Sequence, residues 1–401
     1  MRAGPFRLLC GAGLLAIFSS TISKSPALPL FAAHLGADPS RVGLVASVSA
    51  FTGILVSIPA GMMSDRFGRR RMLIASALVF ATAPFLYLYV DRLWQLALVR
   101  FYHGLATAIF IPVSMALVSD LYKEGRGEKI GWFSTATLTG RFIAPIVGGL
   151  IIGTYAADPA FGFDGVYLLC GLSGLLAFFL IMNIPVGENT VQAAPGWSRA
   201  FAEFKAVANN RSILATSAVE AAILFAYGTF ETFLPLYVIR SGHSAYEVGI
   251  ILSSQVITLA LTKPFMGRFS DKHGRRPQII AGALAGAACM VGVSLSSDLV
   301  PLILLSVLFG LSISIVTSAT SAYVADLSCR EGVGSAMGIL GSIMDTGHTT
   351  GPLVSGFIAA SFGFGKAFVG ASIVLVFFGV VFWFIAVNGQ NKSPAVSGGA
   401  F

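Results

Sequence analysis

Twelve long apolar runs divide this chain, and they constrain its fold more than any other feature. A helix needs about 20 mostly apolar residues to cross the hydrocarbon core of a bilayer. Runs of about this length lie near residues 7–33, 41–63, 72–90, 93–118, 130–153, 164–184, 212–238, 247–269, 278–297, 299–324, 334–359 and 365–388. We therefore expect an all-α integral membrane protein with twelve transmembrane helices.

The composition supports this expectation. Hydrophobic residues make up 55% of the 401 residues and charged residues only 11%, whereas a soluble domain carries about 25% charged residues. The first run could be a signal peptide, but it continues through Pro26 and Pro29 without a small-residue cleavage site. The four cysteines are scattered, so no metal site or disulfide framework is expected.

The basic residues are concentrated in alternate connections. With the N-terminus placed inside, the inner loops and ends carry 18 of the 26 Lys and Arg residues, whereas the outer loops carry only Arg41, Arg92, Arg240 and Lys366. The positive-inside rule then predicts that both termini are cytoplasmic. This distribution explains the net charge of +8 without a nucleic-acid partner. The expected environment is a lipid bilayer, the inner membrane of a bacterium.

The two halves of the chain resemble each other at an offset of 206 residues. The matched positions include Leu28-Pro29-Leu30-Phe31 with Leu234-Pro235-Leu236-Tyr237, Gly104 with Gly310, and Asp120 with Asp326. We expect a six-helix bundle over 1–184, a cytoplasmic linker over 185–211 and a second six-helix bundle over 212–401, related by pseudo-twofold symmetry. The linker is expected to form a short amphipathic helix or a disordered tether. Parallel repeats of this kind are one architecture of secondary transporters.

A glycine-rich basic motif follows the second span and recurs after the eighth. The motif residues are Gly61, Asp65, Arg66, Gly68, Arg69 and Arg70 in the first half and Gly267, Asp271, Gly274, Arg275 and Arg276 in the second. Gly68 permits a tight turn, Gly61 permits close helix packing, and Asp65 can accept hydrogen bonds from a helix N-terminus. The arginines are expected to pair with Asp120 and Asp326 at the inner ends of spans 4 and 10.

These motifs resemble the signature loop of the major facilitator superfamily, and the resemblance extends over nearly the whole chain. Span 5 is similar to the motif of the family's twelve-span drug–proton antiporters, with Ala144 in place of the usual glycine. The residues that carry this similarity are Gly140, Arg141, Pro145, Gly148 and Gly149. The resemblance implies alternating access, a proton gradient as energy source, no bound cofactor and a monomer. Plain helix packing explains these glycines equally well.

Several ionisable residues lie inside the predicted spans, where they are costly and therefore candidates for function. The candidates for proton or substrate binding are Lys24, Arg100, His103, Arg141, Glu220, Tyr227, Glu231, Asp345 and His348. The repeat places Lys24 opposite Glu231. Asp345 and His348 share a helix face, so the proton could be carried by Asp345 with His348 or by Glu231 with Lys24. Lys263 is expected to extend to the interface.

Three functions remain open. The first is proton-coupled export of a drug or metabolite, and the second is import of a small metabolite, with anions among the candidates, by a proton symporter or uniporter. The third is a non-transporting subunit of a membrane assembly. The sequence contains no Walker A loop, no HExxH motif and no convincing catalytic triad, so we expect no enzyme activity and no metal.

Overall fold

The computed structural model describes residues 4–122, 124–184, 210–328 and 333–390. Within these ranges all regular elements are helices. They are, in chain order, α1 (Pro5–Ile22), α2 (Ala27–His34), α3 (Pro39–Phe67), α4 (Arg69–Leu86), η1 (Tyr87–Tyr89), α5 (Leu93–Leu121), α6 (Arg126–Thr154), α7 (Pro159–Met182), α9 (Arg211–Arg240), α10 (Ala245–His273), α11 (Arg275–Leu295), α12 (Leu299–Leu327), α13 (Val333–Phe362) and α14 (Phe364–Gln390). The predicted linker helix falls almost entirely outside the described residues.

Eleven helical segments of the described residues are long and apolar enough to cross a membrane, with α1 and α2 counted together. Helix α13 is not among them, although it is 30 residues long. Its middle carries Asp345, His348 and three threonines at 346, 349 and 350, which lower its hydropathy. An all-helical membrane fold is therefore confirmed, and the predicted eleventh span, α13, is more polar than the other spans.

The first apolar run is not one helix, contrary to expectation. Helix α1 ends at Ile22 and α2 begins at Ala27. Proline has no N–H to donate to the preceding turn and its ring disfavours helical continuation, which explains why the helix breaks before Pro26. Lys24 lies in this break.

The remaining helices begin and end where local chemistry favours it. Asp38 caps α3 by accepting hydrogen bonds from the N–H groups of Ser40 and Arg41, at 2.8 and 3.2 Å. Ser244, its repeat equivalent, caps α10. Gly68 and Gly274 join α3 to α4 and α10 to α11 at φ 91° each, a conformation that favours glycine. We call the end with these two turns the motif end and the opposite one the distal end.

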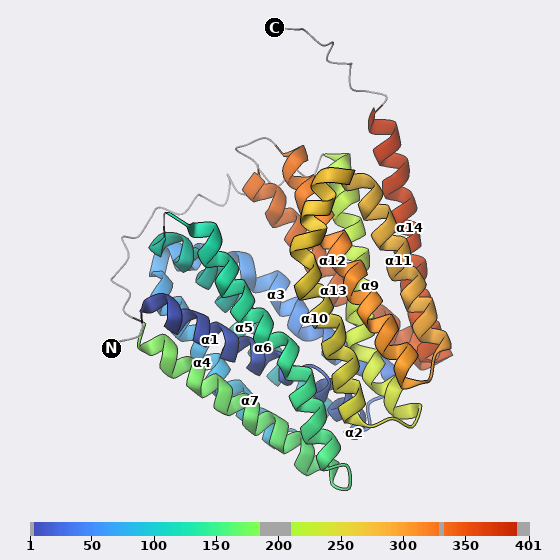
Figure 1. Ribbon diagram of the computed structural model, residues 1–401. Helices are drawn as coiled ribbons and strands as arrows, with labels where there is room; N and C mark the ends of the chain where they lie inside the picture. Colours follow the sequence, from blue (N-terminus) through green and yellow to red (C-terminus); the bar gives the residue numbers. More distant parts are fainter. Residues whose placement is uncertain (1–3, 123, 185–209, 329–332, 391–401) are drawn as a thin grey trace.

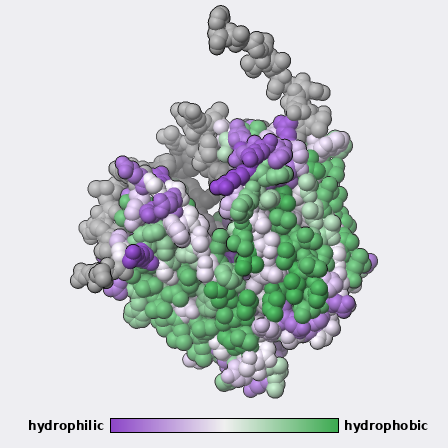
Figure 2. Space-filling model, viewed as in Figure 1, coloured by the Kyte–Doolittle hydropathy of each residue, from purple (hydrophilic) through white to green (hydrophobic). Residues whose placement is uncertain are grey.

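Helices α1 to α7 pack mainly among themselves, as do α9 to α14, and Figure 1 shows the two groups spreading apart at one end. Between the groups, α3 packs against α13 and α6 against α10. Figure 2 shows apolar side chains over the middle of the visible face and polar ones at both ends. Many large apolar side chains are exposed on the helices, among them Leu98, Leu261 and Ile373, and lipid would cover them in a membrane.

Candidate functional site

A cavity of about 470 Å³ lies between the two groups of helices. Helices α1, α3, α5 and α6 line it from one side and α9 and α13 from the other. The lining residues are Ser20, Thr21, Lys24, Ser49, Ala50, Gly53, Ser57, Gly104, Thr107, Ala108, Ile111, Pro112, Arg141, Tyr227, Glu231, Met344, Asp345 and His348. Its volume is in the range of small-molecule sites.

Three of these residues form one polar cluster that connects the two groups. Lys24 Nζ lies 2.7 Å from Glu231 Oε2. His348 Nε2 lies 3.4 Å from the same Glu231 oxygen and 3.2 Å from Lys24 Nζ. The carboxylate of Glu231 therefore lies between a cation and a histidine, and its contact with Lys24 is the one expected from the repeat, which aligns Glu231 with Ser25 beside Lys24.

The geometry of His348 gives this cluster two arrangements. Lysine can only donate hydrogen bonds, and an ionised carboxylate can only accept them. A single ring nitrogen cannot accept from Lys24 and donate to Glu231 at the same time. A change in the protonation of His348 therefore changes which partner its Nε2 can bond.

Arg141, Asp345 and Tyr227 also face the cavity. The Tyr227 ring lies 5.4 Å from that of His348. Asp345 and His348 both line the cavity, as their shared helix face predicts, but no hydrogen bond joins them in the described part of the chain. The side chain of His348 extends instead to Glu231 of α9 and to Lys24 in the break between α1 and α2. Neither Arg141 nor Asp345 has an ion pair to a described residue, and each is left to interact with whatever enters the cavity.

Two of the predicted cavity residues lie elsewhere. Arg100 and His103 are buried, 2% exposed each, inside the first group and do not line the cavity. Arg100 donates to Ser23 Oγ at 3.4 Å and to the Tyr87 hydroxyl at 3.3 Å. The face of α5 that carries them turns toward α1 and η1, so the prediction that they face the cavity is wrong. Gly104 and Thr107 lie on the side of α5 that does line the cavity.

Glu220 is also absent from the cavity wall. It lies on α9, as Glu231 does, but it is buried against α12 and accepts a hydrogen bond from Thr320 Oγ1. The eleven residues between the two carboxylates span about 16 Å along a helix, which carries Glu220 beyond the cavity toward the motif end. Lys263 is exposed and lines a separate pocket between α6 and α10 with Glu128 and Trp132.

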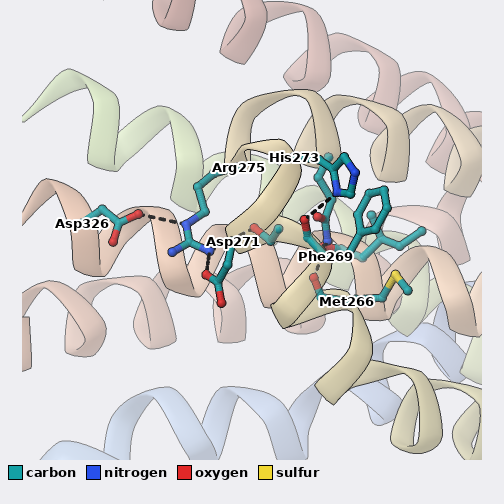
Figure 3. Close-up of polar contacts among 9 residues, drawn as sticks. Met266, Phe269, Asp271, His273, Arg275 and Asp326 are labelled. Carbon is teal, nitrogen blue, oxygen red and sulfur yellow. Dashed lines mark hydrogen bonds and ion pairs between the residues drawn. The ribbon is translucent and has the colours of Figure 1, made fainter.

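At the motif end, the predicted arginine–aspartate pairs are formed. Arg69 Nε lies 3.0 Å from Asp120 Oδ2, and Arg275 Nε lies 2.9 Å from Asp326 Oδ2. Figure 3 shows Arg275 between Asp326 and Asp271, both of which accept hydrogen bonds from its guanidinium. Each pair joins the turn between two helices to a third helix.

The other motif residues have separate contacts. Arg276 Nε donates to the Tyr323 hydroxyl at 2.8 Å. Arg70 reaches the carbonyl of Met182 at 3.5 Å, and the guanidinium of Arg66 lies 5.6 Å from the ring of Phe67. The side chain of Asp65 lies outside the described part, so its predicted role is untested.

The glycines show where the two groups meet. A Cβ atom at Gly149 would lie 2.4 Å from the Ala245 carbonyl oxygen, and one at Gly43 would lie 2.2 Å from that of Pro352. Both contacts are in the distal halves of their helices. At Gly61 and Gly267, toward the motif end, a Cβ would meet nothing within 4 Å. The expected close packing at Gly61 is therefore not found, because the helices stand apart there.

The span-5 motif packs α6 on both sides. A Cβ at Gly140 would lie 2.3 Å from the Leu14 carbonyl oxygen, and one at Gly148 would lie 3.3 Å from Ile22 Cγ1. Both contacts are with α1, whereas Gly149 meets α10. The carbonyl of Pro145 would lie 2.5 Å from a Cβ at Gly249 of α10. The span-5 motif thus positions α6 between α1 and α10. Its contacts with α10 close the distal end, whereas the end with the Gly68 and Gly274 turns is open.

Small polar residues of the cavity were missed from the sequence. Ser20, Thr21, Ser49, Ser57 and Thr107 all line it. Serine and threonine are common in membrane helices, where they bond to their own backbone, so nothing in their spacing sets these apart. Only the repeat, which identifies span 1 as the partner of span 7, offered a signal for Ser20 and Thr21.

Comparison with known proteins shows which family has this architecture. The family model of the Major Facilitator Superfamily matches residues 9–253 and 241–400. The chain belongs to this superfamily. Its members are transporters, so this chain is a multi-pass membrane transporter and not an enzyme.

Two relatives illustrate the similarity. The chain is 27% identical over 370 residues to the multidrug resistance protein MdtG of Salmonella paratyphi C (strain RKS4594), covering 89% of each chain. It is 26% identical over 375 residues to the multi-drug resistance efflux pump PmrA homolog of Lactococcus lactis subsp. lactis (strain IL1403), covering 91% of this chain and 90% of that one.

Solved structures share the fold. A bacterial homolog of the human lysosomal transporter Spinster, in an inward-facing and occupied conformation, aligns with a TM-score of 0.83 at 16% identity, covering 98% of this chain and 100% of that one. The nucleoside transporter NupG aligns with a TM-score of 0.80 at 15% identity, with the same coverage.

Proposed function

We propose that this transporter is a proton-coupled exporter that exchanges protons for small amphipathic molecules across a bacterial inner membrane. It works as a monomer of two six-helix bundles, 1–184 and 212–401, joined by a cytoplasmic linker over 185–211. Twelve helical spans cross the membrane, of which the polar helix α13 is the eleventh, and the motif end and both termini face the cytoplasm. No cofactor is required. The names of the relatives MdtG and PmrA support export.

The cluster of Lys24, Glu231 and His348 carries this proposal. It combines a carboxylate, a cation and a histidine in a cavity between the two bundles. A proton on Glu231 neutralises the carboxylate that holds Lys24. A substrate cation instead displaces Lys24 and pairs with the ionised carboxylate. Proton and substrate thereby compete for one carboxylate, which is the requirement for exchange.

The energy available is sufficient for export. The exchange of one proton for one monovalent cation moves no net charge, so the pH difference across the membrane drives it. A difference of one pH unit is worth about 1.4 kcal/mol, which supports a concentration ratio of roughly 10 for the substrate.

The unpaired cavity residues suggest the substrate class. Arg141 and Asp345 present opposite charges from opposite bundles, and Tyr227 adds an aromatic face. Together they suit a compact amphipathic molecule with an aromatic body and one charged group. Asp345 is the second candidate for the proton.

The turn motifs serve as gates in this scheme. Opening the distal end requires the bundles to rock and the motif ends to approach. The Arg69–Asp120 and Arg275–Asp326 pairs hold each turn rigid within its own bundle while this happens.

Everted vesicles test the proposal. Addition of cationic aromatic compounds to vesicles that contain the protein is expected to drive protons out of the acidified lumen, as a trapped pH-sensitive dye reports. The matched control is Glu220→Gln, which alters a buried carboxylate of the same helix outside the cavity. Absence of proton movement across a broad panel of compounds would refute the proposal.

Import of a small anionic metabolite is the second candidate, and Arg141 favours it because no described acidic residue pairs with it. The direction of flux in whole cells separates the two. Accumulation of a labelled organic anion that depends on Arg141 would favour import.

A further inference from the structure

A second cavity lies at the distal end, separate from the central one. Its volume is about 470 Å³, and it shares no lining residue with the central cavity. One bundle contributes walls from α2, the start of α3, α6 and α7, and the other contributes α9, α10 and α14. The residues are Leu30, Ala33, His34, Ala37, Pro39, Ile152, Gly153, Ala156, Pro159, Phe163, Leu236, Ile239, Arg240, His243, Ser244, Ala245 and Phe364.

The charge of this lining is one-sided. Its ionisable members are His34, Arg240 and His243, and no Asp or Glu is among them. Both nitrogens of His243 are engaged, Nε2 by the Ser297 carbonyl at 2.8 Å and Nδ1 by Glu247 at 3.4 Å. Arg240 provides the positive charge of the cavity that does not depend on pH, whereas His243 is charged only when it is protonated.

Arg240 is held ready to bind an anion. Its guanidinium lies over the ring of Phe364, 4.8 Å from the centroid. No ion pair joins it to an acidic residue of the described chain. Guanidinium groups stacked in this way keep their edge N–H groups free to bind a carboxylate in bidentate fashion. The rest of the wall is mostly apolar and includes the Phe163 ring, with Leu30, Ile152 and Leu236 beside it.

We propose that this distal cavity binds an amphipathic organic anion, an apolar or aromatic body with one carboxylate or sulfonate, that enters from the outer side of the membrane. The charged group lies against Arg240, and the body lies among the apolar residues of α2, α6 and α7. An apolar cavity with one well-placed charge is the usual form of a small-molecule site.

Occupancy of this site is tied to one conformation. The walls belong to both bundles, and the contacts beside the cavity are those of the closed distal end, including Gly153, where an added Cβ would lie 3.4 Å from the Tyr246 nitrogen. Opening the distal end separates the walls and removes the site. A bound anion therefore favours the closed distal end and inhibits transport from outside, a consequence that rests on the proposed alternating access.

Direct binding tests the site without a transport assay. The full chain in neutral phosphatidylcholine nanodiscs is titrated with 1-naphthoate and with uncharged 1-naphthamide. We expect naphthoate to bind at least fivefold more tightly than naphthamide, and Arg240→Gln to weaken naphthoate binding at least fivefold. The matched control is Lys366→Gln, which removes an outer positive charge of α14 that does not line the cavity, and it should leave binding unchanged.

A second variant guards against a misfolded Arg240→Gln. Ala33→Phe fills the cavity without a change of charge, and it should abolish naphthoate binding while size-exclusion behaviour stays that of wild type. Equal binding of naphthoate by wild type and both cavity variants would overturn the proposal. So would equal binding of naphthoate and naphthamide.

Two further arms identify the source of the anion and the effect on conformation. Weaker naphthoate binding in phosphatidylglycerol nanodiscs would identify a lipid headgroup as a natural occupant of the same site. Naphthoate should also speed maleimide labelling of a single cysteine in the central cavity, Ser57→Cys, in a background without native cysteines. Slower labelling would contradict the assignment to the closed distal end. Because binding is measured directly, failure of proton exchange leaves this result interpretable.

Discussion

Glu231 is the acidic residue of the polar cluster that joins the two bundles beside the cavity. Its side chain is 10% exposed and its carboxylate faces both Lys24 and His348. Removal of one partner of a buried ion pair leaves an uncompensated charge, which costs about 3–5 kcal/mol at fully buried sites. The partial exposure of Lys24, at 23%, lowers that figure here because water in the cavity solvates the ammonium group.

A double-mutant cycle measures this pairing. Lys24→Gln and Glu231→Gln should each lower thermal stability in detergent, because each leaves one buried charge unpaired. The double variant should be more stable than either single variant, with a coupling free energy of about 1–3 kcal/mol. Additive losses would mean that the two side chains do not stabilise each other.

His243 provides a pH-dependent contact at the distal end. The hydrogen bond to the Ser297 carbonyl raises the pKa of His243, and Glu247 adds to this effect. The protonated form is therefore favoured in the folded protein. Its contribution to stability is fully present below the ordinary pKa of about 6.5 and is lost as the pH rises through the raised value.

Histidine-selective NMR checks this shift. The pKa of His243 should lie above about 6.5 in wild type, and Glu247→Gln should lower it toward that value. A His243 pKa below the ordinary value in wild type would contradict the contact with Ser297.

Residue roles were predictable where one helix or the repeat determines them. The pairing of Lys24 with Glu231 followed from the repeat, and that of Arg69 with Asp120 followed from charge and position. The partner of His348 did not, because helical spacing places Asp345 beside it while the rotamer extends to other helices. The direction of Arg100 depends on the rotation of α5 about its own axis, which packing decides.

At the scale of helices, four close approaches close the distal end. Glycines 43 and 356 bring α3 to α13, and glycines 149 and 249 bring α6 to α10, with backbone atoms where a side chain would stand. Sequence periodicity predicted most of the helices and both turns at Gly68 and Gly274. It did not predict that Gly61 faces open space, because that depends on which end is closed.

Gly149→Ala should shift the protein away from the closed distal end. The added methyl group would overlap the Ala245 carbonyl, which is backbone and cannot move aside easily. Its control is Gly131→Ala in the same helix, where a Cβ meets nothing within 4 Å and helix propensity favours alanine by about 1 kcal/mol. Spin-label distances across the distal ends of α6 and α10 should lengthen in Gly149→Ala only. Unchanged distances in both variants would show that this contact does not control closure.

At the scale of the whole molecule, the structure is closed at the distal end and open at the motif end. The two-group arrangement and the repeat were predictable, since each bundle must bury its own polar faces. The conformation was not, because one sequence has to support at least two states of similar free energy.

In the proposed mechanism, proton and substrate compete for Glu231, and the cavity also holds the ionisable side chains of Lys24, Arg141, Tyr227, Asp345 and His348. The most direct measurement is the affinity of the purified protein for a cationic substrate identified in the vesicle panel, at pH 5 and at pH 8, in wild type, Glu231→Gln, Asp345→Asn and Glu220→Gln. Wild type and Glu220→Gln should bind at least roughly tenfold more weakly at pH 5, a difference of about 1.4 kcal/mol, whereas Glu231→Gln should show no such dependence. A wild-type affinity that is independent of pH, or a full pH dependence that persists in Glu231→Gln, would contradict competition at this carboxylate.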